Sequence, residues 1–413
     1  MLRNALILLV RLVGTPGAYL AARQARKPVP ERLRILLVRP DYLGDLIMTT
    51  PILSALKQQI PNAHITMLVG PWSAEIVERH PAVDRVITCS FPNLRNGLSS
   101  FFQQYMLLLR MAYWLRKEHY DLAINLRHNY WWGAALLYLA RVPHRIGYAN
   151  IPHTGKPFLT EVLPSSPQEH LSISALRLCS AGLQALGYAP LATPYTPERY
   201  PSFFQVTEAE QQWVEERLSA AGIDSSAPIV VIHPGAGERV KMWRAEAWAT
   251  CAAFLARSSL KGVPIRVVLT GSKQEQSLLD TIARQAGTPV FCITGMTIGQ
   301  LAALLHRAEF VLGLDSGPLH LATAQATPTI RIFGPTKPLR SGPWGSPDRH
   351  IVLCSTHRCP SCPTIPCGRL VFPPGAEVAH PCVRLVPEQA VLDAISRQLS
   401  DVAQLDETLR PGQ

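Results

Sequence analysis

The sequence predicts an α/β protein with two consecutive domains, each built from a parallel sheet covered by helices. Short β-branched runs alternate with helix-length amphipathic stretches, which is the pattern of repeated βαβ units. The alternation stops in the proline- and tyrosine-rich residues 188–206 and then restarts, so this stretch is interpreted as a linker. The length of 413 residues agrees, because ~100–200 residues per domain predict two or three domains.

The individual elements follow from the same patterns. In the first half, strands are predicted at Arg34–Arg39, His64–Val69, Arg85–Thr88 and Asp121–Asn125, and helices at Leu46–Gln59 and Phe101–Lys117. In the second half, strands are predicted at Ile229–His233, Ile265–Thr270, Val290–Ile293, Phe310–Leu314 and Thr329–Phe333. Helices are expected between them at about Arg244–Leu255, Lys273–Arg284, Ile298–His306 and Pro318–Ala324. Residues Pro343–Pro381 are predicted to be irregular, and a last helix is expected at about Pro387–Leu399.

Composition excludes some classes of protein and narrows the partners. Hydrophobic residues make up 47% of the chain and charged residues 17%, which excludes a mainly disordered protein. The 40 Lys and Arg against 29 Asp and Glu give a net charge of +11. Such a surplus favours an anionic partner: a phosphorylated substrate, an anionic membrane surface or nucleic acid. Nucleic acid is disfavoured because the basic residues are scattered and no aromatic-rich recognition motif accompanies them.

The N-terminal segment, residues 1–32, is basic and interspersed with apolar residues. Between Met1 and Leu36, seven Lys or Arg residues accompany a single acid, Glu31. Its longest apolar run near the start, Ala5 to Val10, is far shorter than the ~20 residues of a membrane-spanning helix. Two interpretations remain open. The segment rests on an anionic membrane surface, or it forms a helix that packs on the protein's own body.

The first loop that could carry chemistry runs from Arg39 to Pro51, directly after a predicted strand. Gly44 permits a tight turn, and Asp45 lies at the start of the following helix. The Asp45 carboxylate could cap that helix or act as a general base, and the residues alone leave both roles open.

The second loop, His233 to Trp243, follows the first strand of the second half. Gly235 and Gly237 expose backbone N–H groups, while Arg239 and Lys241 add positive charge. This combination suits an anion such as phosphate, although a plain loop with solvated cations is the alternative. Because Val240 stands where a third glycine would, the loop does not match the full dinucleotide-binding fingerprint.

The third loop, Gly313 to Ala324, also follows a strand and opens a helix. Ser316 is predicted to be its N-cap, and Gly317 precedes a proline in the first turn. The free N–H groups of such a helix start attract anions. His320 could donate to a phosphate oxygen or simply be packed, and Asp315 could hold the loop or reach a ribose hydroxyl.

A fourth loop, Phe333 to Gly345, carries Thr336 and should border the same pocket, although a structural turn is an equal alternative. All four loops follow predicted strands. In open α/β sheets, ligands bind outside the carboxyl ends of the strands. We therefore expect the binding site in a cleft that two such domains form as they face each other.

Nine cysteines are present, and five of them crowd the irregular segment near the C-terminus. Four of these, Cys354, Cys359, Cys362 and Cys367, have spacings that could hold a structural zinc. Reduced thiols on a loop are the alternative interpretation. The odd total disfavours a fully paired disulfide framework and favours a reducing compartment.

In this order and spacing, the segments RPDYLGDLIMTTP, HPGAGERVKMW and GLDSGPLHLATAQATPTIRIFGPT resemble glycosyltransferase family 9, the ADP-heptose:lipopolysaccharide heptosyltransferase family. The likeness extends from about Arg34 to the final helix. The resemblance implies a GT-B fold, in which two Rossmann-like domains face each other across a cleft and a C-terminal helix closes the fold. The resemblance implies five parts: a basic N-terminal segment (1–32), an acceptor-side domain (33–188), a linker (189–206), a nucleotide-sugar-binding domain (207–385) with a Cys-rich loop at 354–382, and a closing helix and tail (386–413).

The resemblance also implies an activity. It is inverting, metal-independent transfer of a sugar, heptose, from an ADP-sugar to a lipopolysaccharide core or a related lipid-linked glycan. No cofactor is implied for catalysis, and the protein would be cytoplasmic or peripheral at the inner face of the cytoplasmic membrane. The implied catalytic residues are Asp45 as base, with Lys241 and His320 at the donor diphosphate. The implied substrate-binding residues are Gly44, Gly235, Gly237, Arg239, Asp315, Ser316, Gly317 and Thr336.

Two departures from the family pattern leave the donor open. The loop before Lys241 has Gly235, Ala236 and Gly237 where relatives often carry Ser or Thr. In some relatives an acid after the next strand contacts the ribose, whereas here Lys273 stands at that position and Glu275 follows two residues later. The alternatives are a GT-B transferase or epimerase that uses a UDP- or GDP-sugar, and a non-catalytic relative with a binding role.

Overall fold

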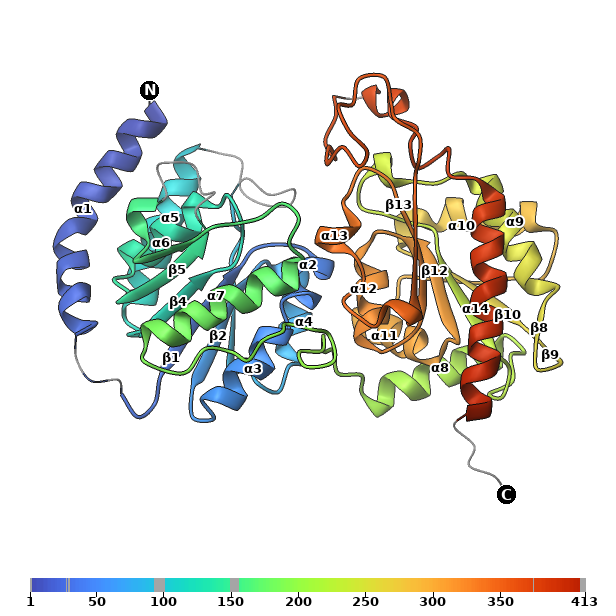
Figure 1. The fold of residues 1–413 in the computed structure, drawn as a ribbon, viewed down its shortest axis with the longest axis horizontal. Helices are drawn as coiled ribbons and strands as arrows, with labels where there is room; N and C mark the ends of the chain where they lie inside the picture. The colour runs from blue at the N-terminus through green and yellow to red at the C-terminus, as the bar shows by residue number, and fades with distance from the viewer. Residues whose placement is uncertain are drawn as a thin grey trace. The chain divides into compact units, whose positions relative to one another are not determined.

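The computed structural model describes residues 2–26, 28, 30–92, 101–148, 156–373 and 375–408. The chain divides into two compact units, Met1–Ser202 and Phe203–Gln413. The division falls within the predicted linker, residues 189–206. Each unit contains a six-stranded sheet in which every pairing is parallel, with helices on the faces (Figure 1).

The first unit has the strand order β3-β2-β1-β4-β5-β6. Its strands are β1 (Arg34–Arg39), β2 (His64–Val69), β3 (Arg85–Thr88), β4 (Leu122–Asn125), β5 (His144–Tyr148) and β6 (Glu161–Leu163). This is the order of a doubly wound dinucleotide-binding fold, whose first strand lies at the centre of the sheet. The four strands predicted in this half are confirmed, and β5 and β6 were missed.

The second unit repeats this order as β11-β10-β7-β12-β13-β14. Its strands are β7 (Ile229–His233), β10 (Arg266–Gly271), β11 (Phe291–Thr294), β12 (Phe310–Leu314), β13 (Thr329–Phe333) and β14 (His350–Cys354), with a small hairpin of β8 (Ser259–Leu260) and β9 (Val263–Pro264). Strand β14 pairs with β13 and corrects the prediction that all of Pro343–Pro381 is irregular. This strand was not predicted because its apolar run is only three residues long and lies between His350 and Cys354.

Helices of the first unit cover both faces of its sheet. They are α1 (Leu2–Gln24), α2 (Leu43–Ile47), α3 (Pro51–Gln59), α4 (Ala74–Glu78), α5 (Phe101–Arg116), α6 (Trp131–Leu139) and α7 (Leu171–Ala185), with the 3-10 helices η1 (Pro71–Ser73) and η2 (Lys156–Phe158). The single helix predicted at Leu46–Gln59 is wrong. Residues 48–50 form a turn between α2 and α3, and Pro51 then opens α3, where its missing N–H carries no cost.

Helix α1 packs on the body of the first unit, as one of the two interpretations of the N-terminal segment expects. Ile7 and Val10 are buried in the cluster that includes α6. The Tyr138 hydroxyl donates to the Arg11 carbonyl at 3.1 Å, and its ring lies where a Cβ on Gly14 would be. No helix within the described residues combines the length and apolar character needed to cross a membrane. The membrane-surface interpretation stays a prediction.

Helices of the second unit are α8 (Glu208–Ala220), α9 (Ala245–Ala256), α10 (Gln276–Ala286), α11 (Ile298–Arg307), α12 (Gly317–Ala324), α13 (Pro338–Ser341) and α14 (Glu388–Thr408), with the 3-10 helices η3 (Arg239–Lys241), η4 (Lys273–Glu275), η5 (Pro347–Arg349) and η6 (Ala376–Ala379). The predicted last helix is confirmed as α14, which buries Val391 and Ile395 in the same cluster as α9 (Figure 1). Trp243 and Trp248 meet edge to face in that cluster, with ring centroids 4.9 Å apart.

Candidate active site

The loop after β1 gathers charged side chains around a buried arginine. Arg39, the last residue of β1, places Nε 3.0 Å from Asp41 Oδ2 and Nη2 3.4 Å from Asp45 Oδ1. Its Nη1 donates to the Leu126 carbonyl at 2.6 Å. Arg127 pairs with the other oxygen of Asp41. A buried guanidinium needs such partners, since an unpaired charge away from water is costly.

Asp45 is the third residue of α2, in the first turn after Gly44. Tyr42 occupies the N-cap position, so the interpretation of Asp45 as the helix cap is wrong. Its side chain is about one-third exposed, and Arg39 Nη2 lies 3.4 Å from its Oδ1. The arginine therefore holds the direction of the carboxylate while leaving it accessible to a substrate hydroxyl. The sequence pointed to Asp45 but not to its pairing with Arg39, six residues earlier, because the direction of the Arg39 side chain is set by the fold.

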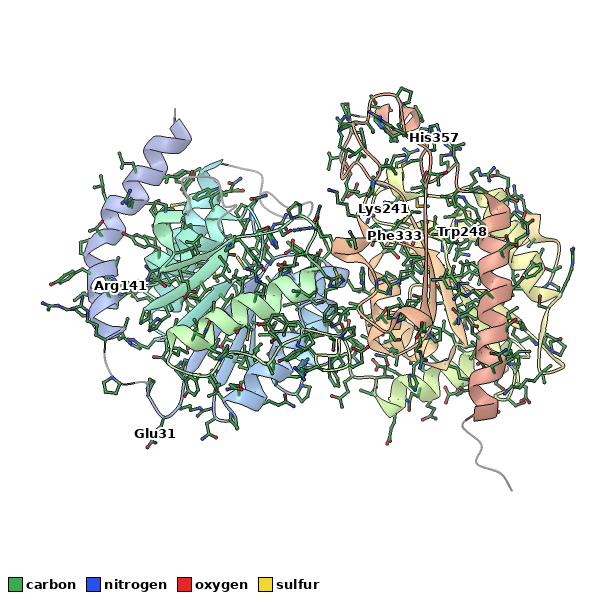
Figure 2. All side chains as sticks on the ribbon, in the orientation of Figure 1. Glu31, Arg141, Lys241, Trp248, Phe333 and His357 are labelled. Carbon is green, nitrogen blue, oxygen red and sulfur yellow. The ribbon has the colours of Figure 1, made fainter. Side chains whose placement is uncertain are left out.

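In the second unit, Lys241 and Asp315 form a close ion pair. Lys241 Nζ donates to Asp315 Oδ2 at 2.7 Å and to the Asp315 carbonyl at 3.0 Å. Lys241, which is labelled in Figure 2, comes from η3 after β7. Asp315 follows β12, the strand that pairs with β7. Burial alone raises the pKa of Asp315, but His320 and Lys241 outweigh it and hold that pKa below its usual range. The carboxylate is therefore ionised at neutral pH.

Behind Asp315 lies a chain of buried polar groups. His320 Nε2 is 3.8 Å from Asp315 Oδ1, and its Nδ1 is 3.4 Å from Nη1 of Arg331. Arg331 is fully buried, and it donates to the carbonyl of Leu319 at 2.6 Å and to the hydroxyls of Thr323 and Thr329. Burial lowers the pKa of Arg331 to about 9, so the guanidinium remains charged at pH 7. The sequence analysis missed Arg331, which looks like one polar residue in an apolar strand.

Two predicted binding residues have buried hydroxyls without a protein partner. Ser316 is the N-cap of α12 as predicted, yet its side chain makes no capping hydrogen bond. Neither Ser316 Oγ nor Thr336 Oγ1 finds a hydrogen-bond partner among the described residues. Buried polar groups are normally paired, and these two hydroxyls are therefore available to bond a ligand.

Gly317 opens α12 beside Pro318, and its N–H belongs to the unpaired first turn of that helix. Strand β12 lies between β7 and β13. The loops that hold Lys241, Gly317 and Thr336 therefore leave the same edge of the sheet, at the carboxyl ends of three adjacent strands. The structure thus brings these predicted donor-site residues to one edge of the second unit.

The loop after β7 is crowded by an acid from the next strand. A Cβ on Gly235 would lie 1.9 Å from Glu275 Oε1, so the glycine is needed for this approach. The other oxygen of Glu275 accepts from the Ser272 backbone N–H at 2.7 Å and from its hydroxyl at 2.8 Å. Arg239 is largely exposed and lies 3.7 Å from Glu377, a contact that contributes little. Gly237 lies between Gly235 and Arg239, in the turn that leads to η3.

A family model and the curated relatives of this chain indicate the same family. Residues 108–367 match glycosyltransferase family 9 (heptosyltransferase). Lipopolysaccharide heptosyltransferase 3 of Escherichia coli (strain K12) is 28% identical over 310 residues, which cover 73% of this chain and 83% of that protein. Lipopolysaccharide heptosyltransferase 1 of Pseudomonas aeruginosa is 27% identical over 337 residues, which cover 77% of this chain and 83% of that protein.

Solved structures agree in fold. The family 9 glycosyltransferase from Veillonella parvula DSM 2008 has a TM-score of 0.69 at 21% identity and covers 89% of this chain and 97% of that chain. The E. coli ADP-heptose heptosyltransferase II has a TM-score of 0.65 at 20% identity and covers 91% of this chain and 100% of that chain. The predicted GT-B type of fold, two Rossmann-like units with a C-terminal helix, is confirmed.

Buried histidines near the second-unit site predict how stability depends on pH. Burial lowers the pKa of His233 to about 4 and that of His350 to about 3. The unfolded state binds these protons near pH 6.5, so the free energy of unfolding should fall as pH drops below about 6.5, by about 1.4 kcal/mol per pH unit for each histidine. We expect His350→Gln to reduce this slope in urea titrations between pH 7 and pH 5.

Exposed His306 supplies the matched control, and His306→Gln should retain the slope of the parent chain. A slope that His350→Gln leaves unchanged would contradict the assignment. Tryptophan fluorescence is a suitable signal, because Trp243 and Trp248 lie in the core of the second unit.

Proposed function

The chain belongs to glycosyltransferase family 9 and is a glycosyltransferase of that family, and from this premise we propose that it transfers heptose from an ADP-sugar to a lipopolysaccharide core or a related lipid-linked glycan. The names of the relatives support this proposal, since lipopolysaccharide heptosyltransferases 1, 2 and 3 are among them. A solved structure of similar fold is the E. coli heptosyltransferase WaaC with ADP, with a TM-score of 0.63, 21% identity and coverage of 89% of this chain and all of that chain.

The observation that carries the donor assignment is the buried Lys241–Asp315 pair beside two unpaired hydroxyls. A diphosphate at this edge of the sheet would accept a charge-assisted hydrogen bond from Lys241 and a hydrogen bond from the backbone N–H of Gly317. The hydroxyl groups of Ser316 and Thr336 would donate hydrogen bonds to the same ligand. Gly235, Gly237 and Arg239 border this edge and complete the donor site in the proposal.

Asp45 is proposed as the general base, held in direction by Arg39 beside Gly44. The carboxylate accepts the proton of an acceptor hydroxyl, whose oxygen then forms a bond to the anomeric carbon. The bond from that carbon to the diphosphate breaks on the opposite side, and its electron pair leaves with the nucleotide. Configuration at the anomeric carbon is inverted.

Negative charge gathers on the departing diphosphate, where Lys241 and the start of α12 stabilise it. In this scheme those groups do the work that a metal ion does in other transferases, so no catalytic metal is required. His320 is proposed to act through Asp315, because its two ring nitrogens lie against Asp315 and Arg331. It keeps the carboxylate in place for Lys241.

The nucleotide is tested with a panel of ADP-, UDP- and GDP-sugars, measured as release of the nucleoside diphosphate in the presence of a lipid-linked glycan acceptor. We expect release of ADP and a thermal shift on adding ADP. Lys241→Ala should weaken ADP binding and lower turnover by ~100–1000-fold, since it removes a preorganised donor. Exposed Arg284 on α10 provides the control, Arg284→Ala. Release of UDP or GDP would favour the alternative donors.

The base assignment is tested by Asp45→Asn, which keeps the shape of the side chain and removes its basicity. Turnover should fall to the background rate while ADP still shifts the melting temperature, because the donor contacts lie in the second unit. Glu31→Gln, an exposed acid of the first unit, is the control and should behave as the parent does. Near-parental turnover by Asp45→Asn would remove the assignment.

We also propose that the first unit rests on an anionic bilayer, which would present a lipid-linked acceptor. Helices α1 and α5 both pack on α6, and each also carries exposed apolar side chains. Those of α5 form one stripe at helical spacing: Phe102, Met106, Leu109 and Tyr113. On α1 the exposed apolar side chains are Leu8, Leu12, Val13, Tyr19 and Leu20.

Charge supports the same partner. Neither helix contains Asp or Glu, and exposed arginines flank the apolar faces, among them Arg11, Arg23, Arg110 and Arg116. Apolar side chains beside basic ones are typical of surfaces that lie in the headgroup region of a membrane. Each basic residue near an anionic surface contributes ~1 kcal/mol.

Flotation with vesicles tests this surface. We expect the parent chain to float with phosphatidylglycerol–phosphatidylethanolamine vesicles and not with phosphatidylcholine alone, because the basic residues need anionic lipid. The double variant Leu12→Asp and Met106→Asp should lose binding. Val263→Asp, an equal change on the exposed hairpin of the second unit, should keep it. Equal flotation of the double variant would contradict the proposal.

A further inference from the structure

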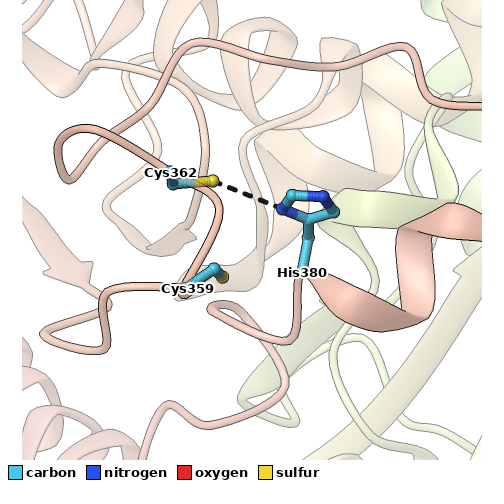
Figure 3. A group of neighbouring side chains, drawn as sticks. All are labelled: Cys359, Cys362 and His380. Carbon is cyan, nitrogen blue, oxygen red and sulfur yellow. Dashed lines mark hydrogen bonds between the residues drawn. The ribbon is translucent and has the colours of Figure 1, made fainter.

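The Cys-rich segment folds so that possible metal ligands converge. The ligand atoms of Cys359, Cys362 and His380 all lie within 4.8 Å of one another (Figure 3). Cys362 Sγ is 3.3 Å from His380 Nδ1. All three side chains are buried, with 2%, 3% and 7% of their surface exposed. The structure thus joins residues up to 21 positions apart in the chain into one enclosed group.

Two more thiols border this group. Cys367 lies within hydrogen-bonding reach of Cys362, and Cys382 within that of Cys359. Cys354, which the spacing suggested as a ligand, is exposed at the end of β14 and lies outside the group. His380 takes the place that the sequence analysis gave to Cys354, and Cys382 joins Cys367 as a candidate for the fourth ligand. The tertiary structure therefore changes the candidate ligand set.

The local backbone suits metal binding. The Cys362 N–H donates to the Cys359 carbonyl at 3.0 Å, so the two cysteines close a tight turn that brings both thiols to the same side. His380 follows η6, and its ring lies against Phe372, with centroids 4.1 Å apart. The turn and the packed ring fix the positions of three ligand atoms before any ion binds.

This segment has little regular secondary structure. Between Cys354 and Glu388, the described residues form a single short helix, η6. Val371, Val378 and Leu385 are exposed, whereas Val383 and Val386 are buried in the core of the second unit, together with Cys359, Cys362 and Cys382. Small structures that cannot bury enough apolar surface are commonly stabilised by a metal or a disulfide. The buried cysteines elsewhere are Cys89, just after β3, and Cys179 in α7 and Cys251 in α9, two helices that pack on a sheet.

We propose that Cys359, Cys362 and His380 hold one thiophilic cation, zinc or iron, with a fourth ligand from the thiol of Cys367 or Cys382. Sulfur-rich tetrahedral sites prefer these metals over magnesium or calcium. Ideal zinc–sulfur and zinc–nitrogen bonds would put the Cys362 and His380 atoms about 3.6 Å apart, close to the distance in the structure. On binding, the three thiols release their protons to solvent, and His380 coordinates as neutral imidazole.

The site has a consequence for the proposed donor site, and that part rests on the proposed function. The Gly368 N–H donates to the Pro335 carbonyl at 2.7 Å, next to Thr336. Val383 and Cys382 pack so closely on Gly334 that a Cβ there would lie 1.9 Å from Val383 Cγ2. The cation would therefore support the loop after β13 through the Cys-rich segment, and its loss should weaken ADP binding.

The test is the metal content of the full chain, purified without chelator, by inductively coupled plasma mass spectrometry. We expect about one zinc or iron per chain, and less than about 0.2 in the double variant Cys359→Ser and Cys362→Ser. Exposed Cys354 supplies the matched control, because Cys354→Ser should keep the metal. Visible absorption separates the metals, since iron thiolate sites are coloured and zinc sites are not.

Cobalt(II) added to metal-free protein gives a second readout that needs no activity. A tetrahedral thiolate site should produce intense visible bands, lost in the double variant. Whichever of Cys367→Ser and Cys382→Ser loses those bands identifies the fourth ligand. Thiol titration in denaturant should find nine reactive thiols, whereas a shortfall of two that remains in the metal-free protein would show a disulfide and overturn the proposal.

Metal-free parent protein with no cobalt bands, or native protein with less than about 0.2 metal per chain, would also overturn it. Metal removal should lower the melting temperature of the second unit by roughly 5–10 °C. If native, metal-loaded chain fails to bind ADP, the proposed function fails while the metal site stands. If ADP binds equally with and without metal, support of the donor loop is wrong.

Discussion

The buried carboxylate of Asp315 is the constraint around which the second unit's site is organised. A charge in this position is tolerable only if it is paired and hydrogen-bonded, and Lys241, from a different strand's loop, supplies the pair. His320 and then Arg331 continue the chain of polar groups into the protein interior. Removing any one member leaves another buried group without its partner, so these residues act as a unit.

The first unit uses the same physical principle with the signs exchanged. There the buried group is a cation, Arg39, and the carboxylates of Asp41 and Asp45 surround it at the end of β1. Both buried charges stand at or just after the carboxyl end of a central strand, β1 in one sheet and β12 in the other. The loops that follow parallel strands all lie at the carboxyl edge of the sheet. A buried charge on one of these loops is therefore paired with an opposite charge nearby.

The Cys-rich segment between β14 and α14 is proposed to be held by metal ligands rather than by paired charges. It contacts the loop after β13 through Gly334 and Gly368, yet it has little regular secondary structure of its own. Ligands that converge on one point can give such a segment a fixed shape, which side-chain burial alone would not. A cation bound in this segment would therefore also hold the loop after β13, which borders the proposed donor site.

By itself, the sequence determined the layered α/β architecture, because buried parallel strands are continuous apolar runs such as Ile229–His233 and Phe310–Leu314. It also located the loops that carry Asp45, Lys241 and Ser316, since glycines and charges directly after a strand are visible locally. Only the tertiary structure identified β5, because His144 and Arg145 make its sequence too polar for a strand prediction. It also showed that α2 and α3 are separate helices.

The tertiary structure alone also decided the partners: Arg39 for Asp45, Arg331 for His320, Glu275 against Gly235, and His380 among the cysteines. The physical reason is common to all four. Each pairing depends on side-chain directions and on which segments the fold brings together, even for Arg39 and Asp45, which are only six residues apart. Strand neighbours are set by packing of the whole sheet, which no local pattern of residues encodes.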